Sequence, residues 1–331
     1  MKALVLNKVK EPLIIEDRSI PEVGKGQVII ELKAAALNRR DCWIVQGLYP
    51  GIQCPVILGS DGAGVVVQTG DGVNAEWKGK EVIINPGYGW GEREDVQSPN
   101  FKILGMPDDG TFAEAIAVPE EQLFPRPEHL TWEEAAALPL AALTAYRALF
   151  KQGELQSSQT VLITGIGGGV AGFALQFAVS AGATVIVTSS SHAKIDKALS
   201  IGAVAGFAYT DDDYTSLLKA EYGPVHLVID GAGGDGFGNL IDIVALGGRI
   251  VNYGATAGVP RELELRKVFW KQLHLVGSTM GSPDDFSDML DMVNRYCIKP
   301  IVDGVFPLSE GNEAIERMGV SSQFGKLVLH M

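Results

Sequence analysis

The stretch that decides the fold is Thr160-Val161-Leu162-Ile163-Thr164-Gly165-Ile166-Gly167-Gly168-Gly169-Val170-Ala171-Gly172. It reads as a buried strand, a glycine-rich turn and the start of a helix that we expect at 173–181. A pyrophosphate group needs backbone without side chains at such a turn, and the helix N-terminus supplies free N–H groups and a positive dipole end. The placement between strand and helix therefore predicts a dinucleotide-binding turn, and a tight turn without a ligand is the alternative.

The pattern of strand and helix continues outward from this stretch. Apolar strand candidates alternate with helical segments such as 192–201, and strands this apolar are typical of a parallel sheet covered on both faces. We therefore predict an α/β fold whose doubly wound parallel-sheet domain spans residues 125–295. The expected strands are 160–164, 184–188, 206–209, 225–230 and 248–252.

The first third of the chain has a different sequence pattern. Short strand-like runs such as 27–32 and 64–67 lie between glycine, proline and asparagine residues, which indicates a β-rich domain. The chain has 331 residues, more than one hydrophobic core usually supports, so two domains are expected. The tail reads again as strand, helix and strand, so we place the first domain at 1–124 and 296–331.

Composition excludes several classes of protein. The formal net charge of −13 disfavours nucleic acid as a partner. No apolar run is long enough for a membrane span, and the first residues do not resemble a secretion signal, so a cytoplasmic protein with no membrane partner is expected. Cys42, Cys54 and Cys297 are odd in number and have no paired spacing, which predicts free thiols rather than disulfides or a zinc knuckle.

The end of the second strand indicates which dinucleotide binds. A carboxylate there would accept a hydrogen bond from the ribose hydroxyl of NAD, but the sequence has Ser189, Ser190 and Ser191, followed by Lys194. Hydroxyls and an ammonium suit the additional phosphate of NADP, which a carboxylate would repel. We therefore expect NADP as cofactor, and a solvated helix cap with a surface lysine is the alternative reading.

With these motifs in place, the chain resembles the medium-chain dehydrogenase/reductases, and among them the zinc-independent quinone oxidoreductases. The resemblance implies a GroES-like catalytic domain built from the N-terminal third and the tail, a Rossmann domain between them, and a homodimer formed through the edge of the Rossmann sheet. The matching segments are 36–41, 47–50, 55–65, 110–114, 135–139, 143–146, 168–170, 247–249 and 324–328.

The resemblance also implies which residues hold the cofactor. One group would approach the pyrophosphate, a second the additional phosphate, and a third the nicotinamide half, with two tail residues closing over the cofactor. The chain departs from the family loop at Ala171, where relatives have a third glycine. The implied residues are Asn38, Thr144, Gly168, Gly169, Val170, Ser189, Ser190, Lys194, Tyr209, Tyr253, Gly254, Ala255, Gly277, Ser278, Thr279, Phe324 and Lys326.

The zinc ligands of the metal-using relatives are missing. Catalytic zinc needs cysteine, histidine or carboxylate ligands around one open position. Where those relatives have a cysteine and a Gly-His-Glu, this chain has Asn38 and Gly59-Ser60-Asp61, and 139–142 offers no third ligand. The stretch 85–110 also lacks the four cysteines of a structural zinc lobe, so we predict that no metal is bound.

Without a metal, the oxyanion formed during reduction needs hydrogen-bond donors. The resemblance places Asn38 and Tyr49 at the nicotinamide, and we expect them to serve as catalytic donors, while Asp41 and Asp61 stabilise loops. The predicted activity is NADPH-dependent reduction of a small quinone or α,β-unsaturated carbonyl compound. The alternatives are an alcohol or carbonyl dehydrogenase with a proton relay through Ser60 and Asp61, and an NADPH-binding protein without turnover, as in lens crystallins of similar sequence.

Overall fold

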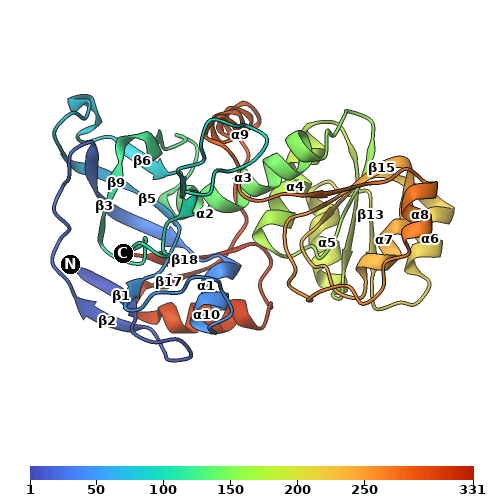
Figure 1. Ribbon diagram of the computed structural model, residues 1–331, viewed down its shortest axis with the longest axis horizontal. Coiled ribbons are helices and arrows are strands. Elements are labelled where there is room, and N and C mark those ends of the chain that lie inside the picture. The colour runs from blue at the N-terminus through green and yellow to red at the C-terminus, as the bar shows by residue number, and fades with distance from the viewer. The chain divides into compact units, whose positions relative to one another are not determined.

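The computed structural model describes residues 1–331 as two compact units (Figure 1). The first unit contains Met1–Ala141 together with Gly281–Met331, and the second contains Ala142–Met280. The second unit is thus inserted between two parts of the chain that fold together. None of the helices combines the length and the apolar character needed to span a bilayer.

A six-stranded parallel sheet forms the second unit, with the order β13-β12-β11-β14-β15-β16. The chain starts at the centre of the sheet and builds one half before the other, which creates a switch point between β11 and β14. The strands are β11 (Thr160–Ile163), β12 (Thr184–Ser189), β13 (Ala205–Ala208), β14 (Val225–Asp230), β15 (Val244–Asn252) and β16 (His274–Gly277).

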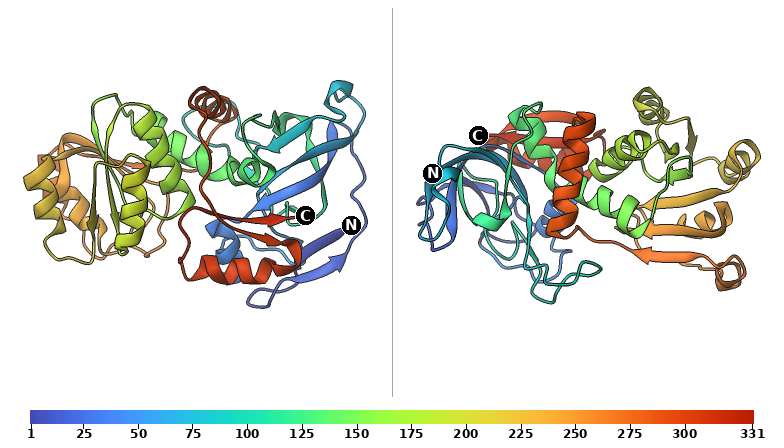
Figure 2. Two further views of the ribbon diagram at one scale, coloured as in Figure 1. Left: turned by 180° about the vertical axis from the view of Figure 1, so that it is seen from behind. Right: turned by 90° about the horizontal axis from the view of Figure 1, so that it is seen from above.

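Helices cover both faces of this sheet (Figure 2). Helices α4 and α5 contact each other, and α6, α7 and α8 form a second contacting series. Leu162, Ile186 and Val228 share an apolar core with residues of α6 and α7. Their strand neighbours are also buried, because successive side chains point to opposite faces. The helices are α4 (Gly169–Ser180), α5 (His192–Ile201), α6 (Tyr214–Tyr222), α7 (Phe237–Ile243) and α8 (Leu265–Trp270).

The first unit is built on a mainly antiparallel seven-stranded sheet in the order β10-β6-β5-β3-β18-β17, with β9 also paired to β3. The long strand β3 pairs with β5, β9 and β18 and so lies at the centre of this sheet. A smaller sheet has the order β2-β1-β4, and β7 pairs with β8. The strands are β1 (Lys2–Leu6), β2 (Ile14–Asp17), β3 (Gln27–Ala36), β4 (Val56–Ile57), β5 (Asp61–Thr69), β6 (Glu81–Ile84), β7 (Gly87–Tyr88), β8 (Lys102–Ile103), β9 (Ala115–Pro119), β10 (Leu123–Pro125), β17 (Val302–Pro307) and β18 (Lys326–His330).

The C-terminal tail completes this sheet, because β18 pairs antiparallel with β3 and β17 pairs parallel with β18 (Figure 1). Short 3₁₀ turns η1, η2 and η4 connect strands and helices. Helix α3 crosses from one unit to the other and continues as the π-helix η3. The remaining elements are α1 (Arg39–Val45), η1 (Ala75–Trp77), η2 (Glu120–Gln122), α2 (Trp132–Ala137), α3 (Pro139–Tyr146), η3 (Arg147–Gln152), α9 (Pro283–Tyr296), η4 (Leu308–Glu310) and α10 (Gly311–Gly319).

The predicted fold class is confirmed, and the expected helix at 192–201 coincides with α5. The unit boundaries differ from the sequence-based ones by about fifteen residues at each junction, since 125–141 and 281–295 lie in the first unit. The cause is packing: α2 contacts β3 and β5. On α9, the ring of Phe286 packs against Phe124 with 4.5 Å between centroids.

The stretch 85–110 forms a folded lobe around an aromatic centre. Trp90 is only 3% exposed, and its ring meets Phe101 edge-on at 5.2 Å between centroids. The indole N–H donates to the carbonyl of Arg93 at 2.9 Å, and Ser282 Oγ at the start of α9 donates to Glu94 at 2.6 Å. Apolar packing and local hydrogen bonds therefore hold this cysteine-free lobe together.

Candidate functional site

The glycine turn of the second unit leaves open space at the start of α4. Gly168 is the N-cap residue, with φ −79° and ψ 158°, and no side chain caps the first N–H groups of the helix. A Cβ added at Gly168 would meet no atom within 4 Å, so the backbone there is accessible to a ligand. Gly167 has φ +134°, which favours glycine. The turn therefore has the shape and the free donors that a phosphate group requires.

Lys194 reaches this turn from the first turn of α5. A Cβ built on Gly167 would lie 2.8 Å from Cδ and 3.1 Å from Nζ of Lys194, so the ammonium lies next to the glycine backbone. Ser189 ends β12, and its Oγ accepts a hydrogen bond from the N–H of Ser191 at 3.1 Å. The N–H of Tyr209, which follows β13, donates to the carbonyl of Ser189 at 3.1 Å. The fold thus brings these predicted residues to one edge of the sheet.

The nicotinamide-side residues follow β15 and β16 at the same edge. Gly254, Ala255 and Gly277 line a largely apolar cavity of about 320 Å³ within the second unit. The N–H of Ser278 donates to the carbonyl of Asn252 at 2.9 Å, whereas the buried Ser278 Oγ has no hydrogen-bond partner. An orphaned buried hydroxyl beside an apolar cavity fits a bound group with polar and apolar parts.

Asp230 connects these strand ends, and the sequence analysis did not identify it. Its carboxylate, 1% exposed, accepts from Thr164 Oγ1 at 2.6 Å, from Asn252 Nδ2 at 2.9 Å and from the N–H of Gly233 at 2.9 Å. The network fixes the loops that follow β11, β14 and β15. The signal that could have revealed it is the single acid at the end of an otherwise apolar strand.

In the first unit, Asn38 belongs to a buried polar cluster. Its Nδ2 donates to Asp61 Oδ2 at 2.9 Å, and its Oδ1 accepts from Lys326 Nζ at 2.6 Å. Lys326 also forms an ion pair with Asp61 Oδ2 at 3.0 Å, and the other carboxylate oxygen accepts from the N–H of Leu140 at 2.8 Å. The cluster holds one negative and one positive charge around the amide.

Arg40 connects Tyr49 to the neighbouring Ser60. Its Nη1 donates to Ser60 Oγ at 2.7 Å and to the carbonyl of Leu104 at 2.6 Å. Ser60 Oγ in turn donates to the same carbonyl at 2.8 Å. The guanidinium carbon lies 4.9 Å from the centroid of the half-buried Tyr49 ring, and Nε donates to the Tyr49 hydroxyl at 3.4 Å. Both Asn38 and Tyr49 are thus held by basic side chains.

Asp41 is a buried carboxyl beside this cluster. Burial raises its pKa from 3.8 to about 6, although the charge of Arg40 and a hydrogen bond from the N–H of Asn38 act in the opposite direction. That hydrogen bond is 2.7 Å long and reaches Oδ2, while Oδ1 has no partner. Asp41 thus caps the start of α1, where Asn38 is the N-cap residue.

The donor set around Asn38 does not fit a zinc ion. Asn38 and Asp61 already bind the ammonium of Lys326, Ser60 is engaged by Arg40, and no group of three histidine, cysteine or acidic residues gathers in the chain. A cation placed there would face a lysine and an arginine instead of soft ligands. In contrast, the open glycine turn and the orphaned Ser278 hydroxyl of the second unit fit a dinucleotide.

The remaining predicted residues lie at defined places in the two units. Thr144 is buried in α3, and Phe324 is buried in the segment that leads into β18. Tyr253 follows β15, and its hydroxyl would lie 2.5 Å from a Cβ at Gly231, so the ring fills the space that this glycine leaves. Sequence reasoning missed the pairing of Lys326 with Asp61. A single charged residue in each of two apolar strands was the available signal.

Two family models match the chain. The alcohol dehydrogenase GroES-like domain matches residues 24–128, and the zinc-binding dehydrogenase model matches residues 169–295. The chain is also similar to the zinc-type alcohol dehydrogenase-like protein YogA of Leptosphaeria maculans. The two are 37% identical over 98% of this chain and 96% of the relative.

Two further relatives cover almost the whole chain. An acryloyl-coenzyme A reductase of Sulfurisphaera tokodaii is 30% identical over 99% of both chains. The crystal structure of an NAD-dependent alcohol dehydrogenase superposes with a TM-score of 0.95 at 36% identity and covers 100% of both chains. Together with the parallel sheet, the glycine turn and the tail that returns to the first sheet, these similarities show that the chain belongs to the medium-chain dehydrogenase/reductase superfamily of pyridine-nucleotide-dependent oxidoreductases.

Proposed function

We propose that the chain is an NADPH-dependent reductase of α,β-unsaturated carbonyl compounds or quinones that works without zinc. The observation that carries the proposal is that the ammonium of Lys326 binds Asn38, where a metal ion would otherwise lie. In the same chain, the glycine turn is open to a dinucleotide. The acryloyl-coenzyme A reductase among the relatives supports an activated alkene as substrate. A reduced nicotinamide, when bound, would supply a hydride, and the proton that such a substrate also takes up would come from water.

The second unit supplies the binding groups for NADPH. Gly168, Gly169 and Val170 would offer backbone N–H groups to the pyrophosphate. Lys194, whose ammonium lies beside the same turn, would hold the additional phosphate. No carboxylate follows β12, so Ser189 and Ser190 can approach the additional phosphate without repulsion. Tyr209 completes this group at the end of β13. Because one similar structure is that of an NAD-dependent enzyme, the preference for NADPH needs a direct comparison of the two cofactors.

A second group of residues is proposed to surround the nicotinamide half of the cofactor. Tyr253, Gly254, Ala255, Gly277, Ser278 and Thr279 would border the nicotinamide half. Burial raises the pKa of Tyr253, so its phenol stays protonated at neutral pH. In the first unit, Asn38 would donate an N–H to the substrate oxygen, and Tyr49, held by Arg40, would form a wall or a second donor.

The test is steady-state oxidation of NADPH and NADH with a panel of enoyl thioesters, enones, quinones, aldehydes and alcohols. We expect turnover with at least one activated alkene or quinone, a higher kcat/KM with NADPH, and no loss of activity with a chelator. Metal analysis of the purified protein should find no stoichiometric zinc. Turnover of alcohols that a chelator abolishes would refute the zinc-independent mechanism, and tight NADPH binding without any turnover would favour a binding protein.

An alcohol dehydrogenase with a Ser60–Asp61 proton relay is the second candidate, favoured by the names of the relatives. The hydrogen bonds weigh against it. Ser60 Oγ already accepts from Arg40 and donates to the carbonyl of Leu104, and both Asp61 oxygens bind other groups. A relay would need these buried contacts to break in each turnover. The alcohol arm of the substrate panel distinguishes the two activities.

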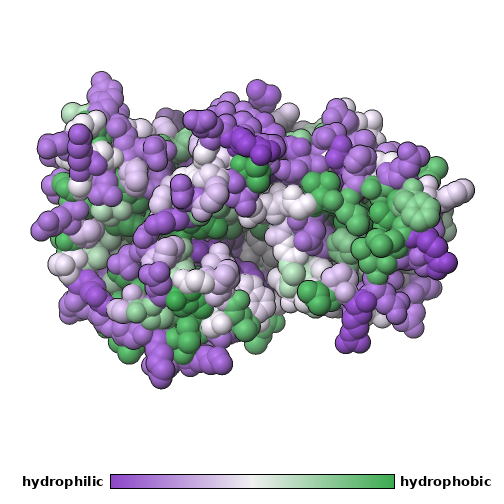
Figure 3. Space-filling model, in the orientation of Figure 1, coloured by the Kyte–Doolittle hydropathy of each residue, from purple (hydrophilic) through white to green (hydrophobic).

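We also propose a homodimer that forms through the β16 edge of the parallel sheet. This edge lacks a further strand, and apolar side chains gather on the surface over the α8 region (Figure 3). An unpaired edge next to an apolar surface is a typical site for association. The most exposed apolar residues in this part of the chain are Leu246 (77%), Val259 (81%), Leu265 (62%), Phe269 (66%) and Trp270 (80%).

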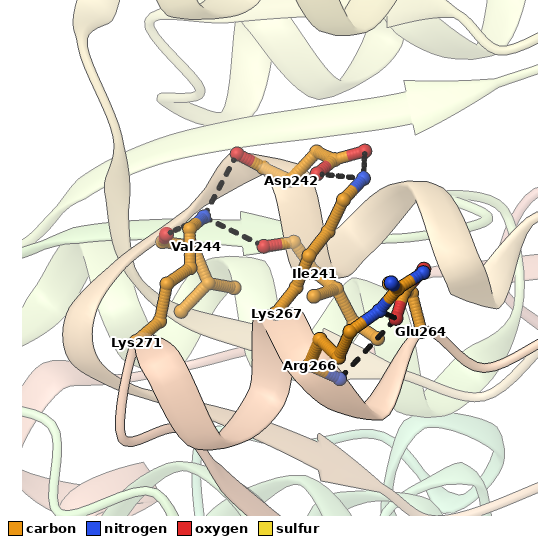
Figure 4. Close-up of polar contacts among 7 residues, drawn as sticks. All are labelled: Ile241, Asp242, Val244, Glu264, Arg266, Lys267 and Lys271. Atoms are coloured by element: carbon orange, nitrogen blue, oxygen red, sulfur yellow. Dashed lines mark hydrogen bonds and ion pairs between the residues drawn. The ribbon is translucent and has the colours of Figure 1, made fainter.

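Helix α8 is firmly attached, so its exposed apolar side chains are a fixed surface (Figure 4). Lys271 Nζ donates to the carbonyls of Ile241 and Val244 at 2.8 and 2.9 Å, which caps the end of α7. Lys267 forms an ion pair with Asp242 at 2.7 Å. Sedimentation should give a dimer for the wild-type chain and a monomer for Trp270→Glu. A monomeric wild-type protein would refute this assembly.

A further inference from the structure

The side chain of Asn38 is held at both ends by charged groups of opposite sign. Its carbonyl oxygen faces the ammonium of Lys326 at 2.6 Å, and its nitrogen faces the carboxylate of Asp61 at 2.9 Å. Lys326 and Asp61 are 3% and 0% exposed, so little water screens these contacts. An ammonium only donates and a carboxylate only accepts, so the reversed amide would meet two repulsive contacts.

The β-sheet register explains why these residues meet. In the antiparallel pair of β3 and β18, Val328 lies opposite Ala36. Asn38 comes two residues after Ala36, and Lys326 comes two residues before Val328, so the antiparallel register places Asn38 opposite Lys326. The N–H of Leu37 donates to the carbonyl of Leu327 at 2.9 Å, which continues the pairing. Asp61 lies opposite Ala36 on the other side of β3. The residues just after β3 and at the starts of β5 and β18 thus bring the three side chains together.

Additional contacts keep the carboxylate fixed. Asp61 Oδ1 accepts from the N–H of Leu140 at 2.8 Å, and the hydroxyl of Thr111 donates to the Asp61 carbonyl at 2.8 Å. Of the two N–H bonds of Asn38 Nδ2, one is given to Asp61. Both N–H bonds lie in the plane of the amide group, so fixing the direction of the first also fixes the direction of the second.

We propose that Lys326 and Asp61 are positioning residues that fix the Asn38 amide in one orientation, so that its second N–H is presented to the carbonyl oxygen of the substrate. The inference rests on the proposed reductase function and assigns Lys326 a role different from cofactor binding. A preoriented donor stabilises developing negative charge without the cost of reorganisation, which a freely rotating amide would incur. An ion pair and an amide would then provide the preoriented donor that the substrate oxygen needs.

The experiment compares Lys326→Met and Lys326→Arg with the wild-type enzyme. Losing a preoriented donor lowers kcat by roughly 100-fold or more, and a donor that is present but free to rotate should cost about 10-fold to 100-fold. We expect that loss in kcat for Lys326→Met, with the Kd for NADPH changed by less than about twofold. Lys326→Arg keeps a charged donor and should recover most of kcat.

A second readout does not depend on turnover. The side-chain amide protons of Asn38 can be assigned by nuclear magnetic resonance, since their signals disappear in Asn38→Asp. In the wild-type protein we expect two separate signals that are protected from exchange with solvent, and in Lys326→Met a loss of that protection. If the wild-type enzyme reduced no substrate, the proposed function would fail, and this measurement would still decide whether Lys326 holds the amide.

Arg317→Met is the matched control. Arg317 forms an ion pair with Asp303 in the same unit and lies over the ring of Phe306, so its loss should lower stability without changing kcat. An unchanged kcat in Lys326→Met would overturn the proposal. So would a parallel rise in the Kd for NADPH and NADH with kcat retained, because Lys326 would then be a cofactor ligand.

Discussion

Replacing Gly168 with alanine should weaken cofactor binding without unfolding the protein. The backbone of Gly168 has φ −79°, which alanine adopts without strain, and the new methyl group would meet no protein atom within 4 Å. Alanine is a poorer N-cap than glycine by roughly 0.5 kcal/mol. Alanine also restricts the unfolded chain more than glycine does, which raises the free energy of unfolding by about 0.4–1 kcal/mol. The free energy of unfolding should therefore change by less than about 1 kcal/mol in either direction.

The same methyl group lies where a pyrophosphate must approach the first N–H groups of α4. We expect the Kd for NADPH to rise at least about 10-fold, which corresponds to about 1.4 kcal/mol of binding free energy. Gly168→Val should have a larger effect for the same reason. The assays are fluorescence or calorimetric titration with NADPH, and urea unfolding without the cofactor.

Gly236→Ala is the matched control, because Gly236 is also an N-cap glycine in the same unit with φ −69° and open space at its Cβ. It should leave both the unfolding free energy and the Kd for NADPH unchanged. The reasoning would be refuted if Gly168→Ala bound NADPH as tightly as the wild-type protein. A loss of affinity that merely followed a loss of stability would refute it equally.

Three more predictions follow from the site and its surroundings. Lys194→Met should raise the Kd for NADPH by about 10-fold or more and the Kd for NADH by less, because a cation beside the additional phosphate is lost. Binding of NADPH should also depend less on salt. Equal effects on both cofactors would place Lys194 at the shared pyrophosphate. A thiol reagent should modify the exposed Cys54 and Cys297 and spare Cys42, whose pKa burial raises to about 12, and mass spectrometry of the folded protein would detect any modified Cys42. The raised pKa of Asp41 means that the folded state binds more protons than the unfolded state between pH 3.8 and about 6, so the unfolding free energy should fall as pH rises through this window. The loss amounts to roughly 3 kcal/mol and should be absent from Asp41→Asn, and equal pH slopes for the two proteins in urea unfolding would contradict the assignment.

The sequence carried much of the information on the second unit. Its apolar strands and their spacing predicted a parallel sheet, and α5 begins and ends at the expected residues. The turn at Gly168 was also predictable, because a glycine cluster between an apolar strand and a helix is a local pattern. The contact of Lys194 with this turn was not predicted, since α4 and β12 lie between them in the sequence.

The long-range partners were not predictable in the same way. Trp90 lies at the centre of the lobe formed by 85–110. For this stretch, the sequence analysis predicted only the lack of a structural zinc site. The boundary between the units lies about fifteen residues from the expected one, because α2 and α9 pack on the first sheet. The local sequence does not show on which sheet a helix packs, whereas packing assigns each helix to one unit.

The sequence by itself determined the strand and helix pattern and the glycine turn, since each depends on neighbouring residues. Only the tertiary structure decided that Asn38 is held between Lys326 and Asp61. These residues lie 288 and 23 positions away from Asn38, and they meet because β18 pairs with β3 in one register. A local pattern cannot specify such a register, because it results from the combined burial and pairing of strands from both ends of the chain.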